Sequence, residues 1–249
     1  MEAVKGLNWL DWVLLTALAG GLVYGWVRGF VAMLTGLAAY VLSLIIAGRY
    51  TSPVVAWLNG SWGATDWLAG VLSRRIALPS ETDSVPASTI SWDKVLQWLA
   101  ALPLPEEYKT QLAHKVQEWS QAGANTSVAD FIFQQLAAGI LSAAVFLILA
   151  GVLGYALSYV GKLVSTYVSE VPLVGTLNRT LGSAAGLLEV AMSASILLSL
   201  LAPLYTLSLF SGLGDAAGAS RIAQWLISLY GLISKWLFGQ GGSFFFYKG

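Results

Sequence analysis

The sequence predicts an all-α polytopic membrane protein, a four-span helical bundle with interfacial amphipathic helices and a small helical loop subdomain. Of its 249 residues, 57% are hydrophobic and only 10% are charged. Soluble domains carry about 25% charged residues, so this chain lacks the polar surface that would keep it in water alone. Four long apolar runs supply the spans, because about 20 apolar residues in a helix cross the ~30 Å hydrocarbon core of a bilayer.

Charge balance and rare residue types exclude several classes of function. Thirteen basic and thirteen acidic residues give no net charge, so no basic field exists that would attract nucleic acid. The chain has no cysteine and a single histidine, which excludes disulfides and both thiolate and multi-histidine metal sites. The sequence contains no G-x-S-x-G or H-E-x-x-H motif either. We therefore expect no metal, no cofactor and no enzymatic activity.

Composition divides the chain into four segments. Most tryptophans and prolines fall between the second and third apolar runs, where most of the charge also lies. The expected segments are a first transmembrane hairpin (1–50), a Trp-rich helical loop subdomain (51–129), a second transmembrane hairpin with an interfacial linker (130–206), and an amphipathic C-terminal helix and tail (207–249).

The first hairpin carries a face of glycines. We expect its spans at Trp9–Val27 and Phe30–Ala47. Gly21, Gly25 and Gly29 recur at intervals of four residues, which leaves one helix face bare and lets another backbone approach closely. We expect this face to pack within the chain, with the second helix of the hairpin folded back on the first. A homodimer seam is the alternative.

The loop subdomain is expected to consist of short helices. Ser52-Pro53 has the pattern of an N-cap followed by a proline in the first helical turn, and the helix it opens should end at Asn59-Gly60. The polar stretch 79–91 has no periodicity and is expected to be a linker. Further helices are expected at Thr65–Ile76, at Trp92–Leu102 after a Ser91 cap, and from Pro105 onward.

The second hairpin begins at a cap-like pair, Ser127 and Asp130. The third span is expected at Leu136–Leu157 and the fourth at Leu181–Tyr205. Between them, an amphipathic extension should start at Ser158 and end at Pro172.

The last apolar segment, Ile222–Phe238, differs from the spans. Arg221 and Lys235 leave only a short uncharged run between them, and polar residues form a stripe along it. An amphipathic surface helix is therefore expected here instead of a fifth span.

Two short motifs carry a resemblance to a known family. R-G-F (Arg28, Gly29, Phe30) follows a first span that opens with W-L-D. L-N-R-T-L-G-S-A-A-G-L-L-E forms the entry to the fourth span and contains Asn178, Arg179, Gly182, Gly186 and Glu189. Together they resemble the colicin V production protein (CvpA) family. The resemblance implies a four-span protein of the bacterial inner membrane that is needed for colicin V production and linked to envelope homeostasis. Members often carry a basic residue where this chain has Glu189.

Three positions admit two interpretations each. Glu189 is either a proton or ion relay, or a structural partner of Arg28 or Arg179 or of interfacial water, since an unpaired charge in a span costs about 3 kcal/mol or more. Asn178-Arg179 either holds an anionic headgroup or a partner, or caps and anchors the start of span four. Asp11 is either a functional carboxylate at the membrane boundary or a first-turn acid that faces the helix dipole and water; we favour the second.

These observations lead to an expected function. We expect a non-enzymatic inner-membrane factor that resembles colicin V production proteins and acts in toxin production or export and in envelope homeostasis. It would sit in the lipid bilayer and serve as a scaffold for partner proteins, with no role for nucleic acid. The alternative is a channel or transporter subunit in which Glu189 and Arg28 line a polar path.

Overall fold

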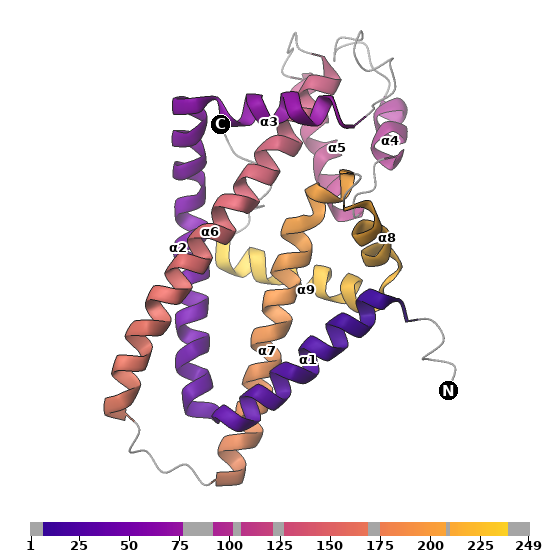
Figure 1. The fold of residues 1–249 in the computed structure, drawn as a ribbon. Coiled ribbons are helices and arrows are strands. Elements are labelled where there is room, and N and C mark those ends of the chain that lie inside the picture. The colour runs from indigo at the N-terminus through magenta and orange to yellow at the C-terminus, as the bar shows by residue number, and fades with distance from the viewer. Residues whose placement is uncertain are drawn as a thin grey trace. The chain divides into compact units, whose positions relative to one another are not determined.

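The computed structural model describes residues 7–76, 92–101, 106–121, 127–168, 175–207 and 210–238. These ranges are helical almost throughout (Figure 1), which confirms the all-α class. Within these ranges, four helical stretches are long and apolar enough to cross a membrane, so the four-span prediction is also confirmed. They are Trp9–Arg28, Phe30–Trp62, Val128–Tyr159 and Gly175–Tyr205.

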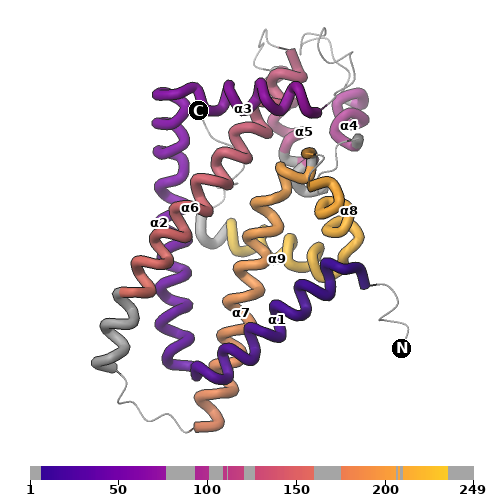
Figure 2. Tube along the Cα trace, viewed as in Figure 1, coloured from indigo at the N-terminus to yellow at the C-terminus, as the bar shows by residue number. Residues whose placement is uncertain are grey.

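The chain folds as two compact units. One comprises Met1–Ser52, Ala144–Ser199 and Ala219–Ser243, and the other Pro53–Ala143, Leu200–Gly218 and Phe244–Gly249. The first unit therefore holds α1 (Trp9–Arg28), α9 (Arg221–Phe238) and parts of three long helices, α2 (Phe30–Trp62), α6 (Val128–Val168) and α7 (Gly175–Leu201). Within this unit α1 crosses α7 obliquely near the connection between α1 and α2 (Figure 2).

The second span is longer than expected, because α2 continues through Pro53 to Trp62. The prediction that Ser52-Pro53 starts a new helix is therefore wrong. The turn before the proline is already helical, and its Thr51 Oγ1 donates a hydrogen bond to the Ala47 carbonyl at 2.7 Å. Proline removes its own N–H from such a helix, and its ring crowds the carbonyl four residues earlier; membrane helices tolerate both effects. The expected end at Asn59-Gly60 is wrong too.

The end of α2 is set by Gly63, whose φ of +59° is left-handed. Such a conformation suits glycine and terminates the helix. The Asn59 carbonyl accepts a hydrogen bond from the Gly63 N–H at 2.8 Å, and Asn59 Oδ1 accepts one from the Thr65 N–H at 3.2 Å. One asparagine thereby accepts the last backbone hydrogen bond of α2 and, through its side chain, a hydrogen bond in the first turn of α3 (Ala64–Ser73).

The third span belongs to α6, a helix of 41 residues. The predicted cap is confirmed, because Ser127 Oγ accepts a hydrogen bond from the Asp130 N–H at 3.1 Å. The helix does not break where periodicity changes at Ser158, and at about 1.5 Å per residue it reaches ~60 Å, about twice the hydrocarbon thickness. The expected linker 79–91, Pro105 and Pro172 lie outside the described residues.

The second unit contains the helical loop predicted between the hairpins. Here α4 (Trp92–Ala101) packs on α5 (Glu106–Gln121), and Leu99 and Leu112 are fully buried. The ring of Trp119, on α5, stacks on the ring of Phe131, on α6, with ring centroids 4.6 Å apart.

The second unit also contains α8 (Ser211–Ala219), which the sequence analysis missed. It follows a 3₁₀ turn, Ala202–Thr206, that continues the fourth span. A Cβ built on Gly214 would lie 2.9 Å from the Tyr205 Cβ, so the glycine allows the helix to lie against the tyrosine.

Candidate functional site

The glycines of the two motifs pack against each other. A Cβ built on Gly25 would collide with the carbonyl oxygen of Gly182, and one on Gly186 would collide with the carbonyl oxygen of Gly21. Because only a bare backbone fits on both sides, α1 and α7 touch main chain to main chain. The glycine face thus packs within the chain, but its partner is α7. The expectation that it packs on the second helix of its own hairpin is wrong.

Asn178 completes this contact at the turn between α1 and α2. Its Oδ1 accepts a hydrogen bond from the Phe30 N–H at 2.8 Å and a longer one from the Val31 N–H at 3.4 Å. Gly29 has a φ of +76°, and a Cβ built on it would lie 2.6 Å from Asn178 Nδ2. Asn178 therefore caps the N-terminus of α2, a distant helix, and not the start of its own helix, as the capping alternative supposed. Its neighbour Arg179 is exposed.

Asp11 is buried, although a water-facing position was expected. Only 1% of its surface is exposed. It forms a capping box with Asn8 at the start of α1, and its Oδ1 accepts hydrogen bonds from Ser220 Oγ at 2.5 Å and from the Ile222 N–H at 3.4 Å. One carboxylate thus satisfies donors at the N-termini of two helices, α1 and α9.

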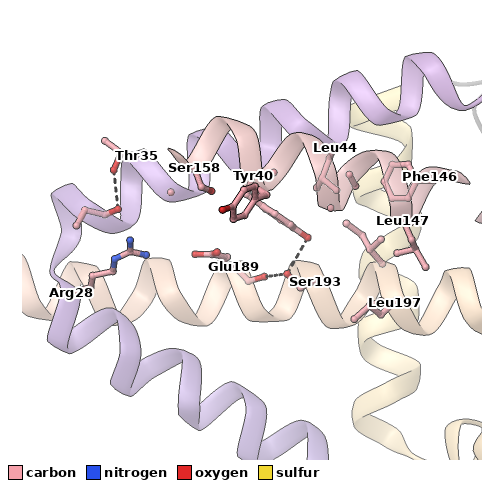
Figure 3. Close-up of a pocket in the computed structure, with 17 residues that line it drawn as sticks. Arg28, Thr35, Tyr40, Leu44, Phe146, Leu147, Ser158, Glu189, Ser193 and Leu197 are labelled. Atoms are coloured by element: carbon pink, nitrogen blue, oxygen red, sulfur yellow. Dashed lines mark hydrogen bonds between the residues drawn. The ribbon is translucent and has the colours of Figure 1, made fainter. Parts of the chain in front are cut away.

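A pocket of about 430 Å³ lies in the first unit between α2, α6 and α7 (Figure 3). Arg28, Thr35, Ser158 and Glu189 contribute polar groups to its wall. Tyr40 Oη and Ser193 Oγ, also in the wall, are joined by a 3.0 Å hydrogen bond. The remaining lining is mostly apolar and includes Leu44, Phe146 and Leu197.

The pocket brings Arg28 and Glu189 together, as one of the two interpretations of Glu189 requires. Their side chains point toward one another, and no hydrogen bond joins them (Figure 3). Arg28 is the positive charge that acts on the Glu189 carboxylate. The guanidinium also donates from Nη1 to Tyr24 Oη and lies 5.3 Å from the centre of that ring, a cation–π distance. Arg179 does not line the pocket.

Sequence reasoning missed the hydroxyl groups of this site. Glu189 and Ser193 lie one turn apart on α7, and Ser193 Oγ donates to the Glu189 carbonyl at 2.8 Å. Thr35 and Tyr40 are polar groups within the otherwise apolar start of α2. Polar positions at helical spacing within apolar runs were therefore the available signal. Within the described ranges, no group of three or more His, Asp or Glu side chains is placed to hold a metal ion.

The fold and the site together define the class of protein. Four helical stretches of the described ranges, long and apolar enough to cross a membrane, define a multi-pass membrane protein, and three of them line a pocket that also holds Arg28 and Glu189. The family model of the colicin V production protein matches residues 10–78, which confirms the resemblance for that part of the chain. The matched segment contains R-G-F, whereas the Asn178 motif lies beyond it. No curated protein and no solved structure matches the chain.

Proposed function

We propose that this protein is a non-enzymatic scaffold of the bacterial inner membrane that holds partner proteins. Its role would be of the colicin V production type, in toxin production or export and in envelope homeostasis. One observation supports a scaffold most directly: the spans that match the family are the least buried within the chain. The most apolar windows of α1 and α2 are 28% and 22% buried, against 39% and 44% for the third and fourth spans.

The outer face of α1 suits a partner helix. Val23 and Val27 are 64% and 78% exposed, and a Cβ built on Gly20 meets no atom within 4 Å. These residues share one side of the helix, opposite the glycines that face α7. A small residue beside two branched apolar ones allows a second helix to approach closely in lipid.

Affinity capture from mild detergent followed by mass spectrometry tests the scaffold. We expect recurrent membrane or envelope proteins with the wild type and their loss with Gly20→Leu, whose side chain enters open space and leaves the fold intact. Gly218→Leu, an equally open position on α8, is the matched control and should retain the partners. Absence of any recurrent protein, or full capture by Gly20→Leu, would count against the scaffold.

A channel or transporter subunit is the second candidate, because Arg28 and Glu189 share one pocket. An ion or proton path needs polar groups or water along its length, and the lining beyond Tyr40 and Ser193 is apolar. The apolar half of the pocket therefore argues against a continuous ion or proton path and favours the scaffold. Ion or proton flux in vesicles separates the two: a Glu189→Gln variant that expresses normally but abolishes flux would establish transport. If the wild type shows no flux and the Glu189→Gln variant still captures the partners, the result would support the scaffold over transport.

A further inference from the structure

Besides Arg28 at the end of α1, the pocket is lined by α2, α6 and α7, and these three helices all change from polar to apolar in the same direction. Along α7 the order is Glu189, Ser193, Leu197, and along α6, which runs antiparallel there, it is Ser158 to Phe146. Figure 3 shows Arg28 and Ser158 at one end and Phe146 and Leu197 at the other. The pocket is therefore an amphipathic slot with its charges gathered at one end.

The slot has the dimensions of one lipid chain. From Ser158 to Phe146, α6 advances about 18 Å at ~1.5 Å per residue, close to the ~15 Å depth of one bilayer leaflet's hydrocarbon. Its charged end lies beside the α1–α2 connection, and such short connections lie at the membrane surface. The volume of about 430 Å³ falls in the range of small-molecule sites.

The charged end holds two opposite charges that do not touch. Arg28 uses one guanidinium N–H for Tyr24, and a guanidinium carries five such donors in a fork that matches phosphate. Glu189 is half-buried, and a carboxylate at this depth gains from a cationic partner. A ligand with both a phosphate and an ammonium would satisfy both side chains at once.

We propose that this pocket binds a membrane phospholipid with a zwitterionic, primary-ammonium headgroup, of the phosphatidylethanolamine type. Arg28 binds the phosphate and Glu189 binds the ammonium. One acyl chain lies in the apolar half, against Leu44, Phe146 and Leu197. An anionic phospholipid such as phosphatidylglycerol would bring a phosphate for Arg28 but no cation for Glu189, so it should bind more weakly.

Native mass spectrometry of the full chain, delipidated and then titrated with defined phospholipids in detergent, tests the proposal. Gly36→Leu and Gly151→Leu fill the polar and apolar halves of the slot, since both glycines line it and a Cβ on either meets no atom within 4 Å. We expect each to lower phosphatidylethanolamine binding at least tenfold. Gly231→Leu, equally open but outside the slot, should bind as the wild type does.

The headgroup assignment has its own variant. Glu189→Gln should remove the preference for phosphatidylethanolamine over phosphatidylglycerol and leave phosphatidylglycerol binding within about twofold. Equal lipid binding by Gly36→Leu, Gly151→Leu and the wild type would overturn the site. A wild-type preference for phosphatidylglycerol would overturn the headgroup. This experiment measures lipid binding and not partner capture. Failure of the lipid proposal can therefore be distinguished from failure of the scaffold proposal.

Discussion

The side-chain oxygen of Asn178 lies 2.8 Å from the backbone nitrogen of Phe30, although the two residues are 148 positions apart in the chain. This hydrogen bond joins the second motif to the first at the turn between α1 and α2. The glycine contacts between α1 and α7 continue the same junction along both helices. Two sequence motifs thus form one interlocked structural element.

Replacement of Asn178 by alanine should weaken this junction. The Phe30 N–H would lose its acceptor, and loss of an N-cap costs about 1 kcal/mol, or a fall of about 2–4 °C in the thermal midpoint for a chain of this size. Asn178→Asp retains the acceptor and should stay near the wild type, as should Arg179→Ala at the exposed neighbour. Tryptophan fluorescence in detergent provides the measurement. Equal midpoints for Asn178→Ala and Arg179→Ala would show that the cap contributes nothing.

The buried carboxylate of Asp11 should be coupled to Ser220. Asp11→Ala leaves the donors at the start of α9 without their acceptor, which should lower the free energy of unfolding by about 1–3 kcal/mol. The double variant with Ser220→Ala should cost less than the sum of the single changes, because residues in one hydrogen-bond network do not act independently. Trypsin should also cut faster after the exposed Arg221 in Asp11→Ala. Strictly additive midpoints with unchanged cleavage would refute the coupling.

Disulfide trapping can test the packing of α2 on α6. A Cβ built on Gly154 lies 3.9 Å from the Ser43 Cβ, within the usual range for a disulfide. The chain has no cysteine of its own, so no native thiol can compete. The Ser43→Cys/Gly154→Cys pair should therefore form a disulfide under mild oxidation. The pair Ser43→Cys/Gly151→Cys is the control and should remain reduced, because a Cβ on Gly151 meets no atom within 4 Å. Mobility on non-reducing gels distinguishes the outcomes.

In the second unit, two glycines of α8 should respond oppositely to alanine. Gly214→Ala would place its Cβ 2.9 Å from the Tyr205 Cβ, and overpacking of this kind costs about 1–3 kcal/mol. Gly218→Ala enters open space and should stabilise the helix by about 0.5–1 kcal/mol. Thermal midpoints of the two variants provide the comparison. A higher midpoint for Gly214→Ala would mean that α8 does not lie against Tyr205.

The spans and the family could be predicted because they depend on local patterns. An apolar run of sufficient length forms a span whatever it packs on, and the Ser127 cap is a contact between near neighbours in sequence. The spacing of the glycines likewise predicts a helix face without side chains. It does not state which helix covers that face, so α7 was not identified as the partner of Gly25.

The contacts that the sequence did not reveal depend on distant residues or on context. Asn178 caps a helix whose start lies far along the chain, and Asp11 is buried because α9 docks on it. Pro53 matches a helix-start pattern. Continuing the existing helix costs one hydrogen bond and crowds the carbonyl four residues earlier, whereas ending it there would leave several backbone groups unpaired. The hydroxyls of Tyr40 and Ser193 form part of a site only once their helices meet.

The backbones of α1 and α7 pack directly against each other through the glycines of the two motifs. The thermal midpoints of Gly25→Ala and Gly20→Ala in detergent test this packing most directly, since both positions lie on α1 and differ only in what their Cβ would meet. We predict a lower midpoint for Gly25→Ala, whose Cβ collides with the Gly182 carbonyl, and an unchanged or higher one for Gly20→Ala. A Gly25→Ala midpoint equal to or above that of Gly20→Ala would mean that the two helices do not pack through Gly25.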